Sequence, residues 1–266
     1  MPKIMLDAGH YGKQNRSPVL PEYWESEMTW KLQNYLKAEL EAYGFTVGTT
    51  RTDQAKDLSV YQRGRKAKGY DLFISLHSNA CGTESVDRVV GIYLVPDDRT
   101  NADEKSKEVA ELLAKGVAGV MPVKGGYQCY CRYDTGDRDG NGKADDNYYG
   151  VLHGARSVNV PGVIIEHSFH TNKASATWLL NDDNLKGMAK REAEILAEYY
   201  GLKKPDIPGD VDGDGIVDSY DALLVKKAAL GTVKLTAEQL KRADSNQDGE
   251  VDSLDYLNVK RKILKS

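Results

Sequence analysis

Two histidines and a glutamate each stand at the end of a short apolar run. Residues 3–9, 71–76 and 161–165 are apolar and rich in β-branched side chains, as buried strands are. These runs are followed directly by His10, His77 and Glu166. In an open α/β sheet, sites form where the carboxyl ends of the strands meet. We therefore expect the three side chains to converge.

Two imidazoles and a carboxylate are a ligand set with known chemistry. Nitrogen ligands with a carboxylate and one open position are typical of catalytic zinc. An isolated histidine would be explained more simply as a hydrogen-bonded turn residue. Because His10 and His77 occupy equivalent strand ends beside Glu166, that explanation is weak here. The pattern predicts a metal-dependent hydrolase.

The composition limits the class of protein. With 266 residues, the chain is long enough for one large domain, or for one large and one small domain. A net charge of −4 does not predict a broad nucleic-acid-binding surface. No apolar run approaches the roughly 20 residues that cross a bilayer. The three cysteines are too few for a disulfide framework.

The first strand is expected directly after the N-terminus, which leaves no room for a secretion signal. An extracellular or wall-associated location would therefore require a signal that has been removed. The alternative is another route of export, such as phage lysis.

Strand-like and helix-like segments alternate up to about residue 201. The strand candidates are residues 3–6, 45–50, 72–76, 89–94 and 163–165. The helical patterns are residues 27–42, 60–68, 104–116 and 185–200. This alternation predicts an α/β fold, a mostly parallel twisted sheet flanked by helices.

A polar connector with two prolines, residues 202–208, separates a first domain (1–201) from a second (209–266). The second domain contains an internal repeat, because the pattern of residues 210–221 recurs at 244–255. An amphipathic segment follows each copy, at 222–230 and 256–264. We expect a small all-α domain of two loop-helix repeats.

Each repeat has the spacing of a calcium loop. Oxygen ligands fall at positions 1, 3, 5, 9 and 12, position 7 offers its main-chain carbonyl, and glycine stands at position 6. The first loop would use Asp210, Asp212, Asp214, Ile216, Asp218 and Asp221. The second would use Asp244, Asn246, Asp248, Glu250, Asp252 and Asp255. All nine aspartates of residues 209–266 occupy such positions, which predicts two bound Ca²⁺ ions.

A similar but incomplete pattern lies in the first domain, within residues 133–147. Asp137, Asp139, Asn141 and Asp145 match positions 1, 3, 5 and 9, whereas Tyr148 stands at position 12. The pattern predicts either a third calcium site or a solvated acidic turn.

The duplicated loops, the helix after each and a basic pair expected in the first turns of each helix make the tail resemble a type I dockerin. Dockerins attach bacterial enzymes to cohesin domains. The resemblance implies a cohesin-binding surface made of Ser219, Tyr220, Lys226, Lys227, Ser253, Leu254, Lys260 and Arg261. The alternative is a calcium-stabilised module that binds cell wall or its own catalytic domain.

Five motifs in order make residues 2–200 resemble the zinc-dependent N-acetylmuramoyl-L-alanine amidases (amidase 3 family). They are residues 6–10, 44–53, 58–63, 72–80 and 161–172. The resemblance implies that His10, His77 and an intervening glutamate hold zinc and that Glu166 transfers protons. Glu25 is the preferred third ligand because it lies three residues before Met28, the first apolar residue of the expected helix; Glu27 is the alternative.

The implied reaction is hydrolysis of the amide bond between the lactyl group of N-acetylmuramic acid and L-alanine of the stem peptide. Zinc would activate a water molecule, and Glu166 would carry its proton to the leaving nitrogen. A zinc peptidase that cuts another wall amide remains open. So do a phage-type endolysin with a wall-binding tail and a binding protein with an inactive site. His170 is expected either to touch substrate or to support the structure.

Overall fold

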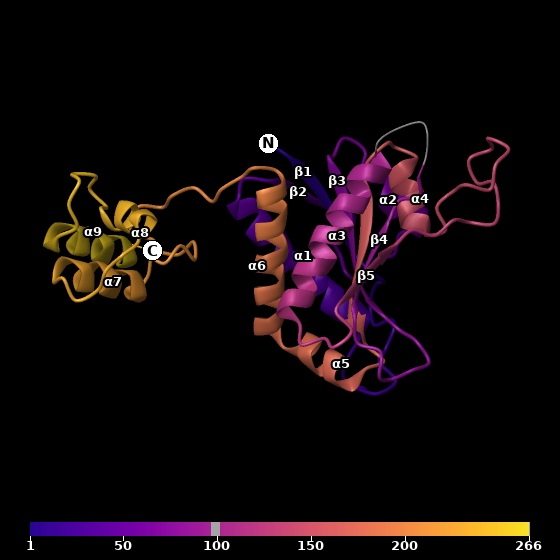
Figure 1. The fold of residues 1–266 in the computed structure, drawn as a ribbon, viewed down its shortest axis with the longest axis horizontal. Coiled ribbons are helices and arrows are strands. Elements are labelled where there is room, and N and C mark those ends of the chain that lie inside the picture. Colours follow the sequence, from indigo (N-terminus) through magenta and orange to yellow (C-terminus); the bar gives the residue numbers. More distant parts are fainter. Residues whose placement is uncertain (97–101, 266) are drawn as a thin grey trace. The chain divides into compact units, whose positions relative to one another are not determined.

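The computed structural model describes residues 1–96 and 102–265. Within it the chain divides into two compact units, Met1–Lys203 and Lys204–Ser266. Figure 1 shows the larger unit as a sheet with helices on both faces and the smaller unit as a group of short helices.

The larger unit contains a sheet with strand order β2-β1-β3-β6-β4-β5. The strands are β1 (Lys3–Ala8), β2 (Thr46–Thr49), β3 (Leu72–Asn79), β4 (Val89–Tyr93), β5 (Tyr127–Tyr130) and β6 (Gly162–Phe169). The pairs β1–β2, β1–β3, β3–β6 and β4–β5 are parallel, and β4 runs antiparallel to β6. The predicted mostly parallel α/β sheet is thus confirmed, and β5 is an additional edge strand.

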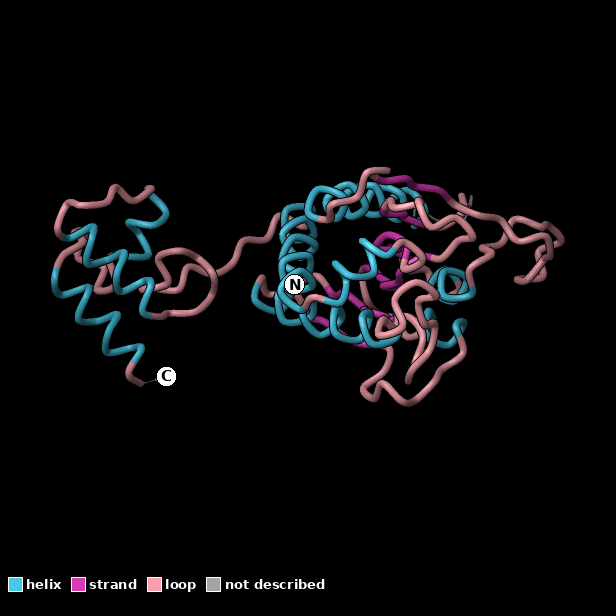
Figure 2. The backbone as a smooth tube through the Cα atoms, turned by 90° about the horizontal axis from the view of Figure 1, so that it is seen from below, coloured by secondary structure: helices cyan, strands magenta, loops and turns pink. Residues whose placement is uncertain are grey.

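Helices cover both faces of this sheet (Figures 1 and 2). One layer contains α1 (Glu25–Ala42), α3 (Ala102–Val120), α5 (Lys173–Leu180) and α6 (Asp182–Tyr199), and the other contains α2 (Val60–Arg65) and α4 (Gly150–Arg156). Alternate residues of the strands pack into the hydrophobic cores on opposite faces of the sheet. Ile4 and Leu6 pack in the core with α1 and α6, whereas Met5 packs in the core with residues of α4.

Two glycines allow α2 and α4 to lie in close contact. A Cβ atom on Gly64 would lie 2.0 Å from the carbonyl oxygen of Val151, and one on Gly154 would lie 2.3 Å from the carbonyl oxygen of Tyr61. Only glycine fits at such a distance. This contact fixes the position of two short helices that border the site described below.

The smaller unit contains α7 (Ser219–Ala229), α8 (Ala237–Ala243) and α9 (Ser253–Ile263) around a small core that includes Val211, Val225 and Val259. None of the helices in the described ranges has the length and apolar character needed to cross a bilayer.

One sequence-based expectation about these helices is wrong. The basic pairs Lys226-Lys227 and Lys260-Arg261 lie in the last turns of α7 and α9, not in their first turns. The helices begin earlier than the apolar pattern indicates, because Asp218 and Asp252 cap them at their N-termini. Basic side chains in a last turn interact favourably with the helix dipole.

Candidate metal centre and catalytic cleft

The parallel strands β1, β3 and β6 bring His10, His77 and Glu166 to the same end of the sheet. His77 and Glu166 are register partners across β3 and β6, and His10 follows directly after β1 and Gly9. His10 has a left-handed backbone, with φ of 59°. A Cβ atom on Gly9 would lie 2.4 Å from the ring of His77, so glycine is required for the two imidazoles to approach each other, with ring centroids 5.3 Å apart.

Glu25, the first residue of α1, lies between the two histidines. One carboxylate oxygen, Oε1, lies 2.9 Å from His77 Nδ1 and accepts a hydrogen bond from the main-chain N–H of Ser78 at 2.9 Å. The other, Oε2, lies 3.2 Å from His10 Nε2 and accepts a hydrogen bond from the side-chain amide of Asn15. The carboxylate is 1% exposed. The site is therefore built around a buried, fully bonded carboxylate.

Glu27, the alternative that the sequence left open, lies elsewhere. Its carboxylate is 39% exposed and lies 3.7 Å from the ammonium group of Lys13. The structure thus brings Glu25, and not Glu27, together with His10 and His77.

The residues present fit a metal ion. Ligand atoms of His10, Glu25 and His77 lie within 4.8 Å of one another, and this set of two imidazoles and a carboxylate is typical of catalytic zinc. Burial alone would raise the pKa of Glu25, but hydrogen bonds from the two histidines hold it well below its usual range. Burial alone would lower the pKa of His77, but the hydrogen bond to Glu25 and its charge raise it to about 9. A divalent cation would replace the protons that compensate this carboxylate.

Glu166 has a different environment from Glu25. Its Oε2 atom is buried, and among the described residues it has no hydrogen-bond partner. Burial raises the pKa of Glu166 to about 7, against the opposing charge of His77. A carboxyl group with this pKa and a free oxygen can accept and release a proton near neutral pH.

A cleft of about 370 Å³ opens over these residues. His10, His77 and Glu166 lie in its wall together with Tyr11, Asp57 and Tyr149. Asp57 is held by the guanidinium of Arg63, which itself is 5% exposed and lies 3.8 Å from the buried Asp7. Arg63 therefore supports the wall of the cleft and the end of β1.

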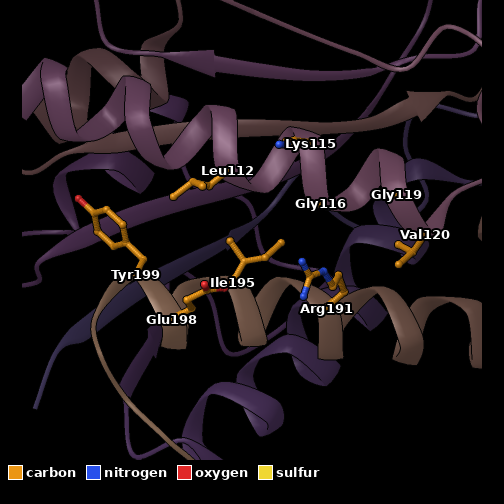
Figure 3. A pocket seen from close by; sticks show the side chains of 9 residues that line it. All are labelled: Leu112, Lys115, Gly116, Gly119, Val120, Arg191, Ile195, Glu198 and Tyr199. Atoms are coloured by element: carbon orange, nitrogen blue, oxygen red, sulfur yellow. The ribbon is translucent and has the colours of Figure 1, made fainter.

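A larger hollow of about 580 Å³ lies between α3 and α6, in the other helical layer (Figure 3). Its wall includes Leu112, Lys115, Arg191 and Ile195. Figure 3 shows apolar side chains there together with the charged side chains of Lys115, Arg191 and Glu198. His10, Glu25 and His77 do not belong to its wall. The candidate catalytic cleft is therefore the smaller one, whose wall includes His10, His77 and Glu166.

Buried polar residues lie behind Glu25. Tyr23 Oη lies 2.7 Å from Ser78 Oγ, which lies 2.9 Å from Nδ1 of His170. His170 is 1% exposed and stacks on the ring of Tyr23, so it supports the structure rather than facing the cleft. No sequence pattern distinguishes Tyr23, because a buried tyrosine resembles any core aromatic.

The two loops of the smaller unit share one hydrogen-bond frame. In the first, Asp210 accepts hydrogen bonds from the main-chain N–H groups of residues 213–215, and Asp221 accepts from those of 211 and 212. In the second, Asp244 accepts from residues 248 and 249, and Asp255 from 245 and 246. Carboxylate oxygens of Asp210, Asp212 and Asp221 lie within 4.8 Å of one another. The arrangement points acidic oxygens at one centre in the first loop.

The loop at residues 137–146 has the same frame with one change. Asp137 accepts hydrogen bonds from the N–H groups of residues 140–142, and Asp146 accepts from those of 138 and 139, as Asp221 does in its loop. The oxygens of Asp137, Asp139 and Asp146 gather within 4.8 Å.

Asp145, predicted for position 9, lies outside this group of three, as Asp214 and Asp218 do in the first loop, and its carboxylate lies 3.4 Å from the side-chain amide of Asn141. The chain returns early because a bridge between Tyr133 and Asn147 closes the loop. Asp146 thereby reaches the place that position 12 takes in the other loops.

Comparison with known proteins finds two families in this chain. A family described as N-acetylmuramoyl-L-alanine amidase matches residues 4–198, and the dockerin type I domain matches residues 208–264. The chain is 24% identical over 227 residues to "N-acetylmuramoyl-L-alanine amidase AmiC" of Neisseria meningitidis serogroup B, covering 74% of this chain and 52% of the relative. It is 27% identical over 178 residues to "Probable cell wall amidase LytH" of Staphylococcus aureus, covering 66% and 50%. The chain thus spans about half the length of these curated relatives.

Solved structures share the fold. Cwp6 from Clostridium difficile has a TM-score of 0.61 at 22% identity, covering 74% of this chain and 29% of that one. An N-acetylmuramoyl-L-alanine amidase from C. difficile 630 has a TM-score of 0.60 at 19% identity, covering 75% and 97%. With the matches over residues 4–198 and 208–264, these findings establish that the chain belongs to the N-acetylmuramoyl-L-alanine amidase family and carries a type I dockerin domain.

Proposed function

We propose that this protein hydrolyses the amide bond between the lactyl group of N-acetylmuramic acid and the L-alanine of the stem peptide in peptidoglycan. The observation that carries the proposal is the convergence of His10, Glu25 and His77 at a cleft whose wall includes both histidines and Glu166, in a chain of the amidase family. The proposed site of action is the cell wall, outside the cell.

His10, Glu25 and His77 would hold one zinc ion. When bound, zinc supplies a Lewis acid that polarises the substrate carbonyl and lowers the pKa of a water molecule toward neutrality. Glu25 is well suited as the anionic ligand, because its two oxygens already face the two imidazoles. His10 and His77 must be neutral to act as ligands, so protons compete with the metal.

Glu166 would be the catalytic acid and base. Its buried oxygen lacks a hydrogen-bond partner among the described residues, and its pKa of about 7 lets it accept a proton from water at neutral pH. The same proton can then pass to the departing alanine nitrogen, which leaves as an amine. The wall residues Tyr11, Asp57 and Tyr149 would position the substrate.

Mass spectrometry of the fragments released from purified cell wall, with zinc present, tests the function. Free stem peptides that begin with L-alanine, beside glycan with unsubstituted lactyl groups, are the expected products. Stems shortened while still attached to sugar would instead indicate a zinc peptidase on the same site. Absence of release, with wall binding retained, would leave a binding protein with an inactive site.

The smaller unit and the 137–146 loop would bind calcium. We propose two ions in the tail, held by Asp210, Asp212, Asp214, Ile216, Asp218 and Asp221 and by Asp244, Asn246, Asp248, Glu250, Asp252 and Asp255. A third ion would be held by Asp137, Asp139, Asn141 and Asp145, with Asp146 as a further ligand. Equilibrium dialysis of the full chain should give three bound calcium ions per molecule and two in Asp146→Asn. Two ions in both proteins would reduce the third loop to a solvated acidic turn.

The tail would attach the enzyme to a cohesin domain. The proposed surface joins residues that follow each loop to the basic last turns: Ser219, Tyr220, Lys226, Lys227, Ser253, Leu254, Lys260 and Arg261. Tyr220 and Leu254 are 54% and 46% exposed, as anchor residues of a contact surface should be. Calcium-dependent binding to a panel of purified cohesins tests this partner. Binding to purified cell wall alone would favour a phage-type endolysin with a wall-binding tail.

A further inference from the structure

A fully buried histidine and glutamate lie on the side of β6 opposite the cleft. Nε2 of His167 lies 3.3 Å from Oε1 of Glu192 on α6, and both side chains are 0% exposed. The second oxygen of Glu192 is buried and, in the described part of the chain, has no hydrogen-bond partner. Apolar residues often replace such a pair without loss of stability. Stability therefore does not explain its presence.

The other ring nitrogen of His167 bonds to the main chain of a proposed metal ligand. His167 Nδ1 lies 2.9 Å from the carbonyl oxygen of His77. Because a carbonyl can only accept, Nδ1 must carry a hydrogen atom. Nε2, the other ring nitrogen, faces the carboxyl group of Glu192 at 3.3 Å. Glu192 thus fixes the orientation of the ring that donates to His77.

The carbonyl group of His77 that accepts this hydrogen bond lies where the pairing of β3 and β6 becomes irregular. The β3–β6 register runs regularly to the pair His77–Glu166 and then shifts between His77 and Asn79. A bulge interrupts ladder hydrogen bonds and changes the direction of side chains. Here both His77 Nδ1 and the N–H of Ser78 reach Oε1 of Glu25, each at 2.9 Å. The carbonyl of His77 is bonded by the ring of His167.

The pair His167–Glu192 also affects Glu166, because His167 directly follows Glu166 on β6. Ile164 and Ile165 belong to the two opposite cores, so Glu166 and His167 project from opposite faces of β6. Fixing the His167 ring against α6 therefore fixes the segment from which Glu166 enters the cleft.

We propose that His167 and Glu192 are positioning residues, which hold the main chain of His77 in the bulged conformation where His77 and Ser78 both reach Glu25. This inference rests on the proposed function for the identity of the metal and the reaction. The pair touches neither the substrate nor the metal. Its effect is on how tightly the metal is held and how well Glu166 is aimed.

A matched series of variants tests the proposal in the full chain. Glu192→Leu removes the carboxylate, and two double variants add His167→Asn or His167→Leu, so that no buried carboxylate is left unpaired. Asparagine can place an N–H near the position of Nδ1, whereas leucine cannot. Each protein is titrated with zinc alone in competition with a chelator. Each is also measured for thermal unfolding in a chelator and for kcat and KM on a muramyl peptide.

The leucine double variant should bind zinc about tenfold more weakly or worse, with a lower kcat and little change in KM. The asparagine double variant should bind zinc much more tightly than the leucine one, and Glu192→Gln should stay close to the parent. Equal zinc affinity in the two double variants would overturn the proposal. So would a lower melting temperature with unchanged zinc affinity and kcat, because that describes a purely structural pair.

Two further outcomes remain decisive. If the leucine double variant does not fold, the comparison of Glu192→Leu with Glu192→Gln carries the same test. If the parent releases no product from the muramyl peptide, the proposed function fails. The zinc affinities of the series still decide whether the pair positions His77.

Discussion

At the scale of single residues, the site separates two carboxylates by their surroundings. Glu25 is surrounded by hydrogen-bond donors, and its pKa lies well below the usual range, whereas Glu166 has an unpartnered oxygen and a pKa of about 7. Opposite environments of this kind assign opposite roles. We therefore propose that Glu25 is the anion that holds the metal and that Glu166 exchanges protons.

Glu166→Gln should therefore lose activity and keep the metal. We expect kcat to fall by about a thousandfold, within the range for loss of a general acid or base, while the Kd for zinc stays unchanged. Glu25→Gln should instead lose zinc, because the anionic ligand is gone. Zinc titration and stem-peptide release measure both effects. Loss of zinc from Glu166→Gln would make Glu166 a ligand and remove it from proton transfer.

Glu166 should also make the metal-free protein less stable as the pH rises. Burial raises its pKa from 4.5 to about 7, so the folded state favours the protonated form. The resulting stabilisation is complete below pH 4.5 and is lost as the pH rises to about 7. Glu166→Gln lacks this loss, so its unfolding free energy relative to the parent should increase over that window and level off above it. Urea unfolding in a chelator at several pH values measures the difference, and a constant difference would contradict the raised pKa.

At the scale of elements, the sequence predicted five of the six strands, the long helices and the short helix α2, but not α4 or β5. The apolar run before His77 identifies β3 because a buried strand must be apolar on both faces. By contrast, α4 starts with a glycine and follows Tyr149, which makes no side-chain cap hydrogen bond, whereas Ser59 caps the similarly short α2. Its position comes from contact with α2, a tertiary effect that no local pattern contains. The edge strand β5 has no β-branched residue and is half-exposed, so it lacked the buried-strand signal.

Tertiary contacts also limit how well the ligands of the candidate metal sites can be predicted from the sequence. Counting loop positions found Asp137 and Asp139 but missed Asp146, because the count assumes a loop of fixed length and puts Tyr148 at position 12. The bridge between Tyr133 and Asn147 closes this loop early and brings Asp146 to that place. At the start of α1, the sequence likewise preferred Glu25 as the third ligand but kept Glu27 as an alternative. The structure distinguishes them because β1 and β3 bring His10 and His77 to Glu25.

Contact between α2 and α4 should control the cleft that both helices border. Gly64→Ala places a methyl group against the carbonyl of Val151, so we expect a loss of about 1–3 kcal/mol in the free energy of unfolding and a higher KM. Gly187→Ala is the matched control, because Gly187 is an exposed residue of α6 and its Cβ would meet nothing within 4 Å. That variant should gain about 0.5–1 kcal/mol. Equal effects of the two substitutions, measured by denaturant unfolding, would contradict the role of the close contact.

At the scale of the whole molecule, the two units are proposed to use metals of different chemistry. The larger unit offers two imidazoles and a carboxylate, a set suited to zinc. The smaller unit offers only oxygen atoms and has a small apolar core, so its carboxylates repel one another unless a hard cation joins them. Each unit should therefore depend on its own metal.

Calorimetry of the full chain tests this separation. After metal removal, calcium at about 100 times its Kd should stabilise the smaller unit by about 2.7 kcal/mol for each independent site. Zinc should raise only the transition of the larger unit. Asp210→Asn should weaken the response of the smaller unit to calcium, and His77→Ala should abolish the response of the larger unit to zinc. If the 137–146 loop binds calcium, calcium will also raise the larger unit's transition, and Asp146→Asn will remove that increment without changing the zinc response. A single transition that responds to both metals in every variant would show that the two units unfold as one.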